Sequence, residues 1–479
     1  MIKETIGKMV ARCREVFNNV RTKGYAGYQA AGNLVKSGRL GGMIQENQEK
    51  IFFAYKAILT LLYAFFQYPR FGYSGYASDL DFLRLIIGWL VYIGTVRMIR
   101  TDRDDVCSMF LYTIFMLSIA PFIVIYEFDA SYKLWMILLQ VACLLFMKFL
   151  FSLNLKLPES FRGISYKNTK LRLVATVTLA AYLVYCLWRF GLPVLSSLSF
   201  NDVHQIRAEV NLSTFESILQ NVLCKAICPV YLVVTLKEKR WGWFAFALLV
   251  QLYTYSVTGF KTYLFIPAIL IALQLVPRLS VKKTILAGLP LGSFFLGLLY
   301  SITHSNMLYA LIGDRIIFMP ARIKFSYFDY FSQYDFVYFS QNSFSKIFGI
   351  QSNYSTPVPY LIGELYFNKP EMWTNTGFMA DAYSNLGVLG MVLMAMLLAA
   401  VLIVLRYALR SADGKLQKAI QAIFVTFFIA LNDGPVISEL FSGGMLVAVV
   451  VVLLVDFGDD AKEGVPLMRN FATRRKNNK

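Results

Sequence analysis

Long apolar stretches alternate with short polar connections along most of the chain. Twelve stretches approach the roughly 17 to 25 residues that a helix needs to cross the hydrocarbon of a bilayer. They lie near residues 51–68, 80–98, 106–126, 133–152, 172–190, 217–236, 241–257, 262–277, 284–303, 377–405, 419–437 and 440–456. The pattern predicts an all-α polytopic membrane protein with about twelve transmembrane helices.

The same pattern divides the chain into five segments, which we define by their residue numbers. They are a basic amphipathic N-terminal segment (1–50), transmembrane helices 1 to 9 (51–303) with outer loops 191–216 and 258–261, a large outer loop with short helices (304–376), transmembrane helices 10 to 12 (377–456) and a basic tail (457–479).

Composition and charge agree with a membrane protein. The chain is 57% hydrophobic and 16% charged, with a mean hydropathy of +0.53, which is too apolar for one soluble core. If the N-terminus is cytoplasmic, 34 of the 47 Lys and Arg residues fall on the inside and 10 on the outside. This bias follows the positive-inside rule, so we expect both termini to be cytoplasmic. The net charge of +18 then indicates contact with anionic lipid and no nucleic-acid partner.

The large outer loop carries the first candidate site residues. Eleven of the 24 residues from 325 to 348 are Phe or Tyr, and cations stand at the head of this stretch. Cations beside aromatic faces suit sugars and phosphates, although the aromatic side chains could equally pack an amphipathic helix onto the membrane. The candidates in this loop are His304, Arg315, Arg322, Lys324, Tyr327, Tyr330 and Asn375.

Two other outer segments add basic residues. His204 and Arg207 are three residues apart, so a helix places them on one face, where a solvated interfacial helix is the alternative interpretation. Lys261 follows the Thr258-Gly259 turn and stays at the membrane surface against the charge bias, either to meet a phosphate or as a snorkelling lysine.

The tenth predicted span begins with TNTGFMADAYSNLGVLG (374–390), whose one charge is Asp381. A carboxylate inside the top of a spanning helix is costly unless it is paired, so Asp381 is a functional candidate with an outer arginine as its expected partner. Tyr383 in the same stretch is a candidate for substrate binding. His204, His304 and Asp381 remain alternatives for a general base.

Metal chemistry has one candidate, the DxD sequence formed by Asp79 and Asp81 in the first outer loop. An Asp near a helix start also favours the positive end of the helix dipole. Because the sequence offers no second outer cluster of carboxylates or histidines, we expect no metal and no cofactor.

Four pieces of the sequence together resemble one family. They are the GLPVL loop with His204 and Arg207, the TGFK turn, the stretch DRIIFMPARIKFSYFDYFS and the stretch TNTGFMADAYSNLGVLG. In their order and sidedness, over roughly residues 185–400, they resemble the Wzy-type oligosaccharide repeat-unit polymerases of bacteria, which make O-antigen and exopolysaccharide.

The resemblance implies a metal-independent glycosyltransferase of the GT-C type in the bacterial inner membrane, with a periplasmic active site. Such an enzyme moves a growing glycan from undecaprenyl diphosphate to the non-reducing end of a new lipid-linked repeat. Arg207, Arg315 and Arg322 would hold the diphosphate, with Lys261 as a helper. The implied partners are undecaprenyl-diphosphate-linked oligosaccharides, the lipid bilayer, and a chain-length regulator and a flippase of the same pathway.

Two alternatives stay open. An O-antigen ligase would share the arginine chemistry but use a lipid A core acceptor. A polysaccharide flippase or transporter would be no enzyme, and the lack of an internal sequence repeat lowers that interpretation.

Overall fold

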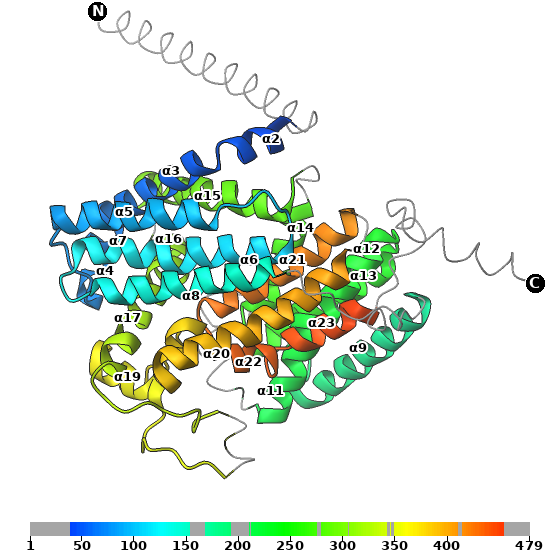
Figure 1. Ribbon diagram of the computed structural model, residues 1–479. Coiled ribbons are helices and arrows are strands. Elements are labelled where there is room, and N and C mark those ends of the chain that lie inside the picture. Colours follow the sequence, from blue (N-terminus) through cyan, green and yellow to red (C-terminus); the bar gives the residue numbers. More distant parts are fainter. Residues whose placement is uncertain are drawn as a thin grey trace, which may run out of the picture.

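The computed structural model describes a bundle of helices (Figure 1). It describes residues 39–153, 168–192, 210, 212–274, 279–304, 306–342, 345, 349–410 and 414–454. Within these residues there is no strand. Most of segment 1–50, the tail 457–479 and most of the outer loop 191–216, including His204 and Arg207, lie outside the described residues.

The helices follow one another with short connections. Their bounds are α2 Arg39–Glu46, α3 Gln48–Leu62, η1 Tyr63–Gln67, α4 Tyr68–Phe71, η2 Gly72–Ser74, α5 Phe82–Ile99, α6 Val106–Ile114, η3 Phe115–Ile119, α7 Ala120–Phe128, α8 Leu134–Ser152, α9 Asn168–Phe190, α11 Thr214–Asn221, η6 Val222–Ile227, α12 Cys228–Lys237, α13 Trp241–Thr258, α14 Thr262–Gln274, α15 Val281–Thr303, α16 Asn306–Tyr309, η7 Ala310–Phe318, α17 Met319–Phe331, α19 Val358–Phe367, α20 Phe378–Leu409, α21 Gly414–Leu431, α22 Val436–Leu440 and α23 Met445–Leu454. Here η2 is a 3₁₀ turn, and η1, η3, η6 and η7 are π-helical segments.

The predicted class, an all-α polytopic membrane protein, is confirmed. Each of the twelve predicted spans is helical over most of its described length. Among the described residues, nine helices are long and apolar enough to cross a membrane. The other three predicted spans correspond to α13, α14 and α21, which are shorter or more polar.

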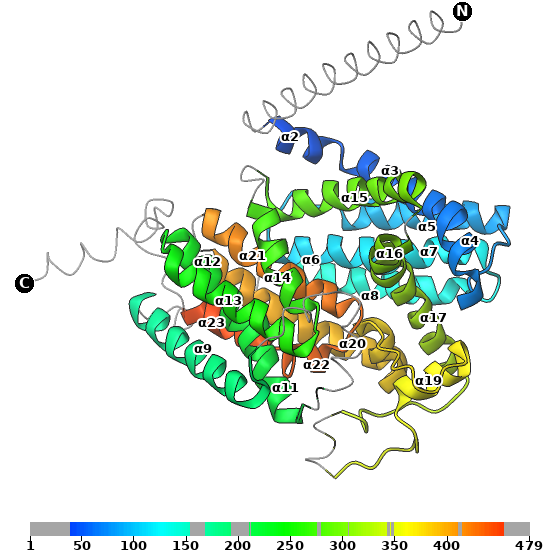
Figure 2. The same cartoon turned by 180° about the vertical axis from the view of Figure 1, so that it is seen from behind.

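The helices pack around two hydrophobic cores. The larger core joins α3 to α8 with α15 to α23, and the helix Val106–Phe128 is buried on all sides at its centre. The smaller core joins α9, η6, α12, α13 and the start of α14. Figures 1 and 2 show α9, α12 and α13 on the side of the bundle away from α4 and α5. Contacts of η6 with α23, and of α14 with α21, join the two cores.

Basic helix ends meet at one end of the bundle. Asp104, in the connection between α5 and α6, pairs with Lys282 at 3.4 Å and with Lys283 at 3.2 Å. Its neighbour Asp105 lies 3.8 Å from Arg406, near the end of α20. Helix ends that the charge bias predicts on one side of the membrane therefore do lie together.

The head of the predicted outer loop differs from a loop, because residues 306–331 form one helical run through α16, η7 and α17. Pro320 lies in the first turn of α17, as expected for a helix start. Aromatic side chains of α17 pack inside the protein: Phe325 stacks on Tyr132 with ring centroids 4.1 Å apart, and Phe328 is fully buried. Most of these rings are therefore core residues.

Candidate functional site

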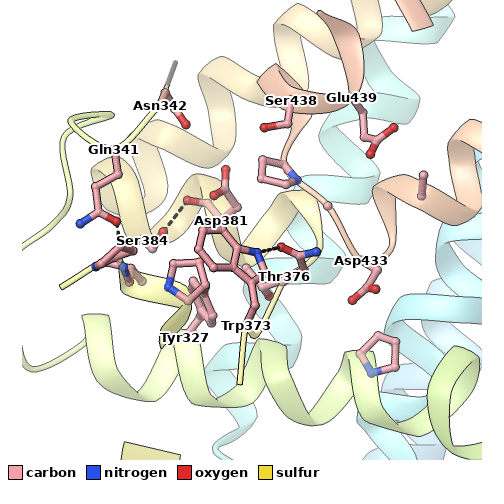
Figure 3. Close-up of a pocket in the computed structure, with 18 of the residues that line it drawn as sticks. Tyr327, Gln341, Asn342, Trp373, Thr376, Asp381, Ser384, Asp433, Ser438 and Glu439 are labelled. Atoms are coloured by element: carbon pink, nitrogen blue, oxygen red, sulfur yellow. Dashed lines mark hydrogen bonds between the residues drawn. The ribbon is translucent and has the colours of Figure 1, made fainter. Parts of the chain in front are cut away.

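A cavity of about 870 Å³ lies where the two helix cores meet. Its walls come from η6, η7 and α17, from the irregular segments 337–342 and 352–359, from residues 373–376, and from the ends of α20, α21 and α22 that face one another (Figure 3). This size is in the range of about 300 to 1,000 Å³ found for small-molecule sites. The cavity is our candidate site.

Two cations line the cavity, and each stands on a π-helical segment. Arg315 comes from η7 in the larger core, and Lys225 comes from η6 in the smaller core. Within the part of the chain that the structure describes, neither side chain makes a hydrogen bond or an ion pair. The wider turn of a π-helix is often found at functional sites, where it redirects side chains. Both cations therefore remain available to an anionic ligand.

Three carboxylates line the same cavity from three segments, Asp381 in the first turn of α20, Asp433 after α21 and Glu439 in α22 (Figure 3). The carboxylate of Asp381 has no hydrogen-bond partner among the described residues, whereas its backbone carbonyl accepts bonds from Ser384 and Asn385. One carboxylate oxygen of Glu439 is buried without a partner. Over the described ranges, no group of three or more His, Cys, Asp or Glu residues is placed to hold a metal ion.

Lys324 supports the cavity wall from behind. Its ammonium is buried and donates to the side-chain oxygen of Asn432 at 2.6 Å, and Asn432 lines the cavity. Burial lowers the pKa of Lys324 to about 7, although the nearby charge of Asp433 raises it in part. A Cβ on Gly377 would lie 2.5 Å from the Lys324 side chain, so this junction is tightly packed.

Asp433 is enclosed by protein atoms on most sides, yet its side chain is exposed to the space of the cavity. Enclosure raises the pKa of its carboxyl, while Lys324 and Arg315 act to lower it. Because the cavity side is open, we treat Asp433 as a carboxylate that a ligand can reach.

The structure brings together four of the residues predicted from the sequence. These are Arg315, Tyr327, Asn375 and Asp381, all of which line the cavity. They come from two elements and one connection that are far apart in the sequence. The predicted pairing of Asp381 with an outer arginine is not seen, because no ion pair to Asp381 forms among the described residues.

Arg322 was predicted at the site but does not line the cavity. Its guanidinium packs over the rings of Phe367 at 4.4 Å and Tyr76 at 5.3 Å, and it donates to the carbonyl of Tyr366 at 3.4 Å. A Cβ on Gly75 would come within 2.4 Å of it. Arg322 is therefore a packing residue on the far side of α17.

The remaining candidates lie elsewhere. Tyr330 stacks on Tyr334 with centroids 4.4 Å apart, and Tyr383 packs in a cluster of aromatic rings. His304 ends α15 with a left-handed backbone (φ 51°) and is exposed away from the cavity. Lys261 is not a lining residue, although its neighbour Thr262 is.

Asp81 has a structural role. Its carboxylate accepts hydrogen bonds from the backbone N–H groups of Leu83 at 2.8 Å and Arg84 at 3.2 Å, and it thereby caps α5. This is the helix-start alternative to a metal-binding DxD.

The sequence interpretation missed Lys225, Trp373, Asp433 and Glu439 as site residues. Lys225 had a usable signal, because a lone charge within an apolar span is functional by default, the same reasoning that singled out Asp381. Asp433 precedes a Gly-Pro pair that indicates the end of a helix, and the structure shows that this end also faces the cavity.

Comparison with protein-family models, curated proteins and solved structures finds no match for this chain. The fold and the site therefore define a class only: a membrane-embedded helical protein with a cavity lined by cations, carboxylates and aromatic rings.

Proposed function

We propose that this protein is a Wzy-type polymerase that joins undecaprenyl-diphosphate-linked oligosaccharide repeats on the outer face of a bacterial inner membrane. The observation that carries the proposal is the cavity in which Arg315 and Asp381, both without a protein partner among the described residues, face the same space. The resemblance of the sequence to this family supports it, as does the all-helical membrane fold.

Arg315 suits the leaving group. When the bond between the sugar and the diphosphate breaks, negative charge grows on the departing phosphate oxygen, and a fixed guanidinium stabilises that charge in place of a metal ion. The planar fork of an arginine binds phosphate through two parallel hydrogen bonds. An arginine already committed to a carboxylate could not do this, so the absence of a printed ion pair at Arg315 matters.

Asp381 suits the acceptor. The attacking hydroxyl of the new repeat must lose its proton as its oxygen forms a bond to the sugar carbon, and the unpaired carboxylate of Asp381 accepts that proton. His304 is exposed away from the cavity, which leaves Asp381 as the predicted base that the structure brings to the site. The cavity can hold a few sugar rings with the diphosphate, so a longer glycan must extend out of it.

The test is elongation by purified protein in lipid nanodiscs, supplied with lipid-linked repeats extracted from the producing cells. We expect the wild type to make chains without any lipid A core acceptor. Arg315→Ala should lower the rate by about 10²- to 10³-fold, as the loss of one transition-state donor does. Asp381→Asn should lower it by about 10²- to 10⁴-fold.

Arg100→Ala is the matched control, because Arg100 forms an exposed ion pair with Glu49 and does not line the cavity. This variant should elongate at the wild-type rate. Chain transfer that requires a lipid A core acceptor would identify a ligase instead. If the wild type elongates but Arg315→Ala elongates equally fast, the assignment of Arg315 is refuted.

A further inference from the structure

Trp373 is a large aromatic side chain that is exposed at the cavity. It lies in the connection between α19 and α20, it lines the cavity, and 52% of its surface is exposed (Figure 3). Half-exposed tryptophans are unusual in a well-packed site unless a ligand covers them, because the indole ring is a large apolar surface.

The ring of Trp373 is held in place. Its edge-to-face contact with Tyr360 of α19 has centroids 4.9 Å apart and an angle of 85° between the planes. Its indole N–H donates to the side-chain oxygen of Asn375, two residues further on. With its N–H engaged and one edge supported, the ring has a fixed direction before any ligand arrives.

The backbone that carries the ring is anchored as well. The carbonyl of Pro359 accepts two hydrogen bonds from Thr374, from its N–H at 3.2 Å and from its hydroxyl at 2.6 Å. The carbonyl of Thr374 accepts the hydroxyl of Tyr327 at 3.0 Å. Thr374 therefore ties this extended segment to α17 and to the start of α19, while its neighbours Trp373 and Asn375 reach the cavity.

Polar groups stand beside the exposed ring. The oxygen of the Asn375 amide accepts the indole N–H, so its NH₂ group keeps two donors for a ligand. The hydroxyl of Thr376 lines the same cavity and is buried without a hydrogen-bond partner in the described structure. An apolar face flanked by amide and hydroxyl groups matches the chemistry of a sugar ring, which has one face of C–H bonds and a rim of hydroxyls.

We infer that Trp373 is the platform of a carbohydrate subsite, on which one pyranose ring of the oligosaccharide stacks while Asn375 binds its hydroxyls. The C–H bonds of the sugar carry partial positive charge and meet the negative face of the indole. This subsite rests on the proposed function, which supplies the oligosaccharide, and it deepens that function by assigning the residue that holds the sugar. The alternative occupant, the lipid interface, is where exposed tryptophans of membrane proteins often lie.

The test measures binding directly, apart from chain growth. Oligosaccharides are released by mild acid from the diphosphate-linked lipid pool of the producing cells, labelled with a fluorophore at the reducing end and titrated with purified protein in nanodiscs, with anisotropy as the readout. Trp373→Ala should bind roughly two- to tenfold more weakly, and Trp373→Phe, which keeps an aromatic face, should recover most of the affinity. Trp188→Ala is the matched control, because Trp188 is 80% exposed on α9 and lies outside the cavity.

The outcomes separate this inference from the proposed function. If the wild type binds and Trp373→Ala binds equally well, the platform is refuted while the polymerase proposal stands. If the wild type binds no oligosaccharide, the subsite is refuted, and the elongation assay with Arg315→Ala still decides the function. If Trp373→Ala and Trp188→Ala both lower the thermal stability and neither changes binding, Trp373 is a lipid anchor and the inference fails.

Discussion

The ion pair between Lys56 and Glu127 allows a quantitative test of the fold. Lys56 Nζ lies 2.6 Å from Glu127 Oε1, and both side chains are completely buried between α3 and α7. The ammonium also lies 4.2 Å from the ring centre of Trp89, and the second carboxylate oxygen of Glu127 has no partner in the described structure. Both residues lie in helices long and apolar enough to span the membrane.

The geometry sets the size of the effect. At 2.6 Å and an effective dielectric constant of about 20, the attraction is roughly 6 kcal/mol, while removing two ions from water costs several kcal/mol for each. The intact pair therefore adds little net stability. Removing one partner leaves the other charge buried and unpaired, which costs about 3 to 5 kcal/mol. We expect Lys56→Met to destabilise the protein by about this amount, and the double variant Lys56→Met/Glu127→Leu to recover most of the loss.

The assay is SDS-driven unfolding in mixed micelles, followed by tryptophan fluorescence, with the two single variants and the double variant forming a cycle. A strong positive coupling between the two sites is the expected result. If Lys56→Met costs less than about 1 kcal/mol, or if the double variant is as unstable as the sum of the singles, the reasoning from burial is refuted.

Two glycines of α5 test the same pair from the side. A Cβ on Gly88 would lie 2.2 Å from Glu127 Oε1, whereas a Cβ on Gly94 would meet nothing within 4 Å. Alanine normally stabilises a helix interior by up to about 1 kcal/mol relative to glycine. Gly94→Ala should therefore be neutral or stabilising, and Gly88→Ala should destabilise because it pushes the carboxylate away from Lys56. Equal effects at both glycines would contradict the observed packing.

Two further predictions concern α17. Arg322→Ala should lower the unfolding free energy by about 1 to 2 kcal/mol through the loss of the contacts with Phe367 and Tyr76, while elongation per folded molecule stays near wild type; a stable but inactive variant would return Arg322 to the active site. For Lys324, burial lowers the folded-state pKa to about 7 from an unfolded value near 10.5, so above pH 7 the unfolded chain binds more protons and stability rises with pH up to about 10.5, by at most about 1.4 kcal/mol per pH unit. Lys324→Met should remove this rise in unfolding titrations from pH 7 to 9, and an unchanged slope would contradict a largely neutral buried lysine.

The fold class could be predicted from the sequence because apolar length and charge bias are local properties of the chain. The twelve predicted stretches are helical for this reason. The count of spanning helices was less accessible, since α13, α14 and α21 are shorter or more polar and depend on their neighbours for burial. The role of the large outer loop was hardest, because an aromatic helix that packs inside the protein has the same composition as an aromatic binding loop.

The candidate site could be predicted in part, and the division follows which neighbours decide each role. Asp381 stood out because it is a lone charge in an apolar stretch, which needs no knowledge of other segments. Arg315 and Arg322 are seven residues apart and look alike in the sequence, yet one faces the cavity and the other packs against α19 and the turn at Gly75. That difference depends on long-range packing, which no local pattern contains.

Lys225 shows what the packing adds. In the sequence it is a single cation in the sixth predicted span, without an obvious partner. In the structure η6 joins α23 of the larger core, and this contact places Lys225 at the wall of the cavity that also holds Arg315. Each core thus contributes one cation that has no protein partner in the described structure, and neither core alone could surround an anion. An anionic group bound between them would favour the joined arrangement of the two cores, so ligand binding and the contact between the cores should stabilise each other.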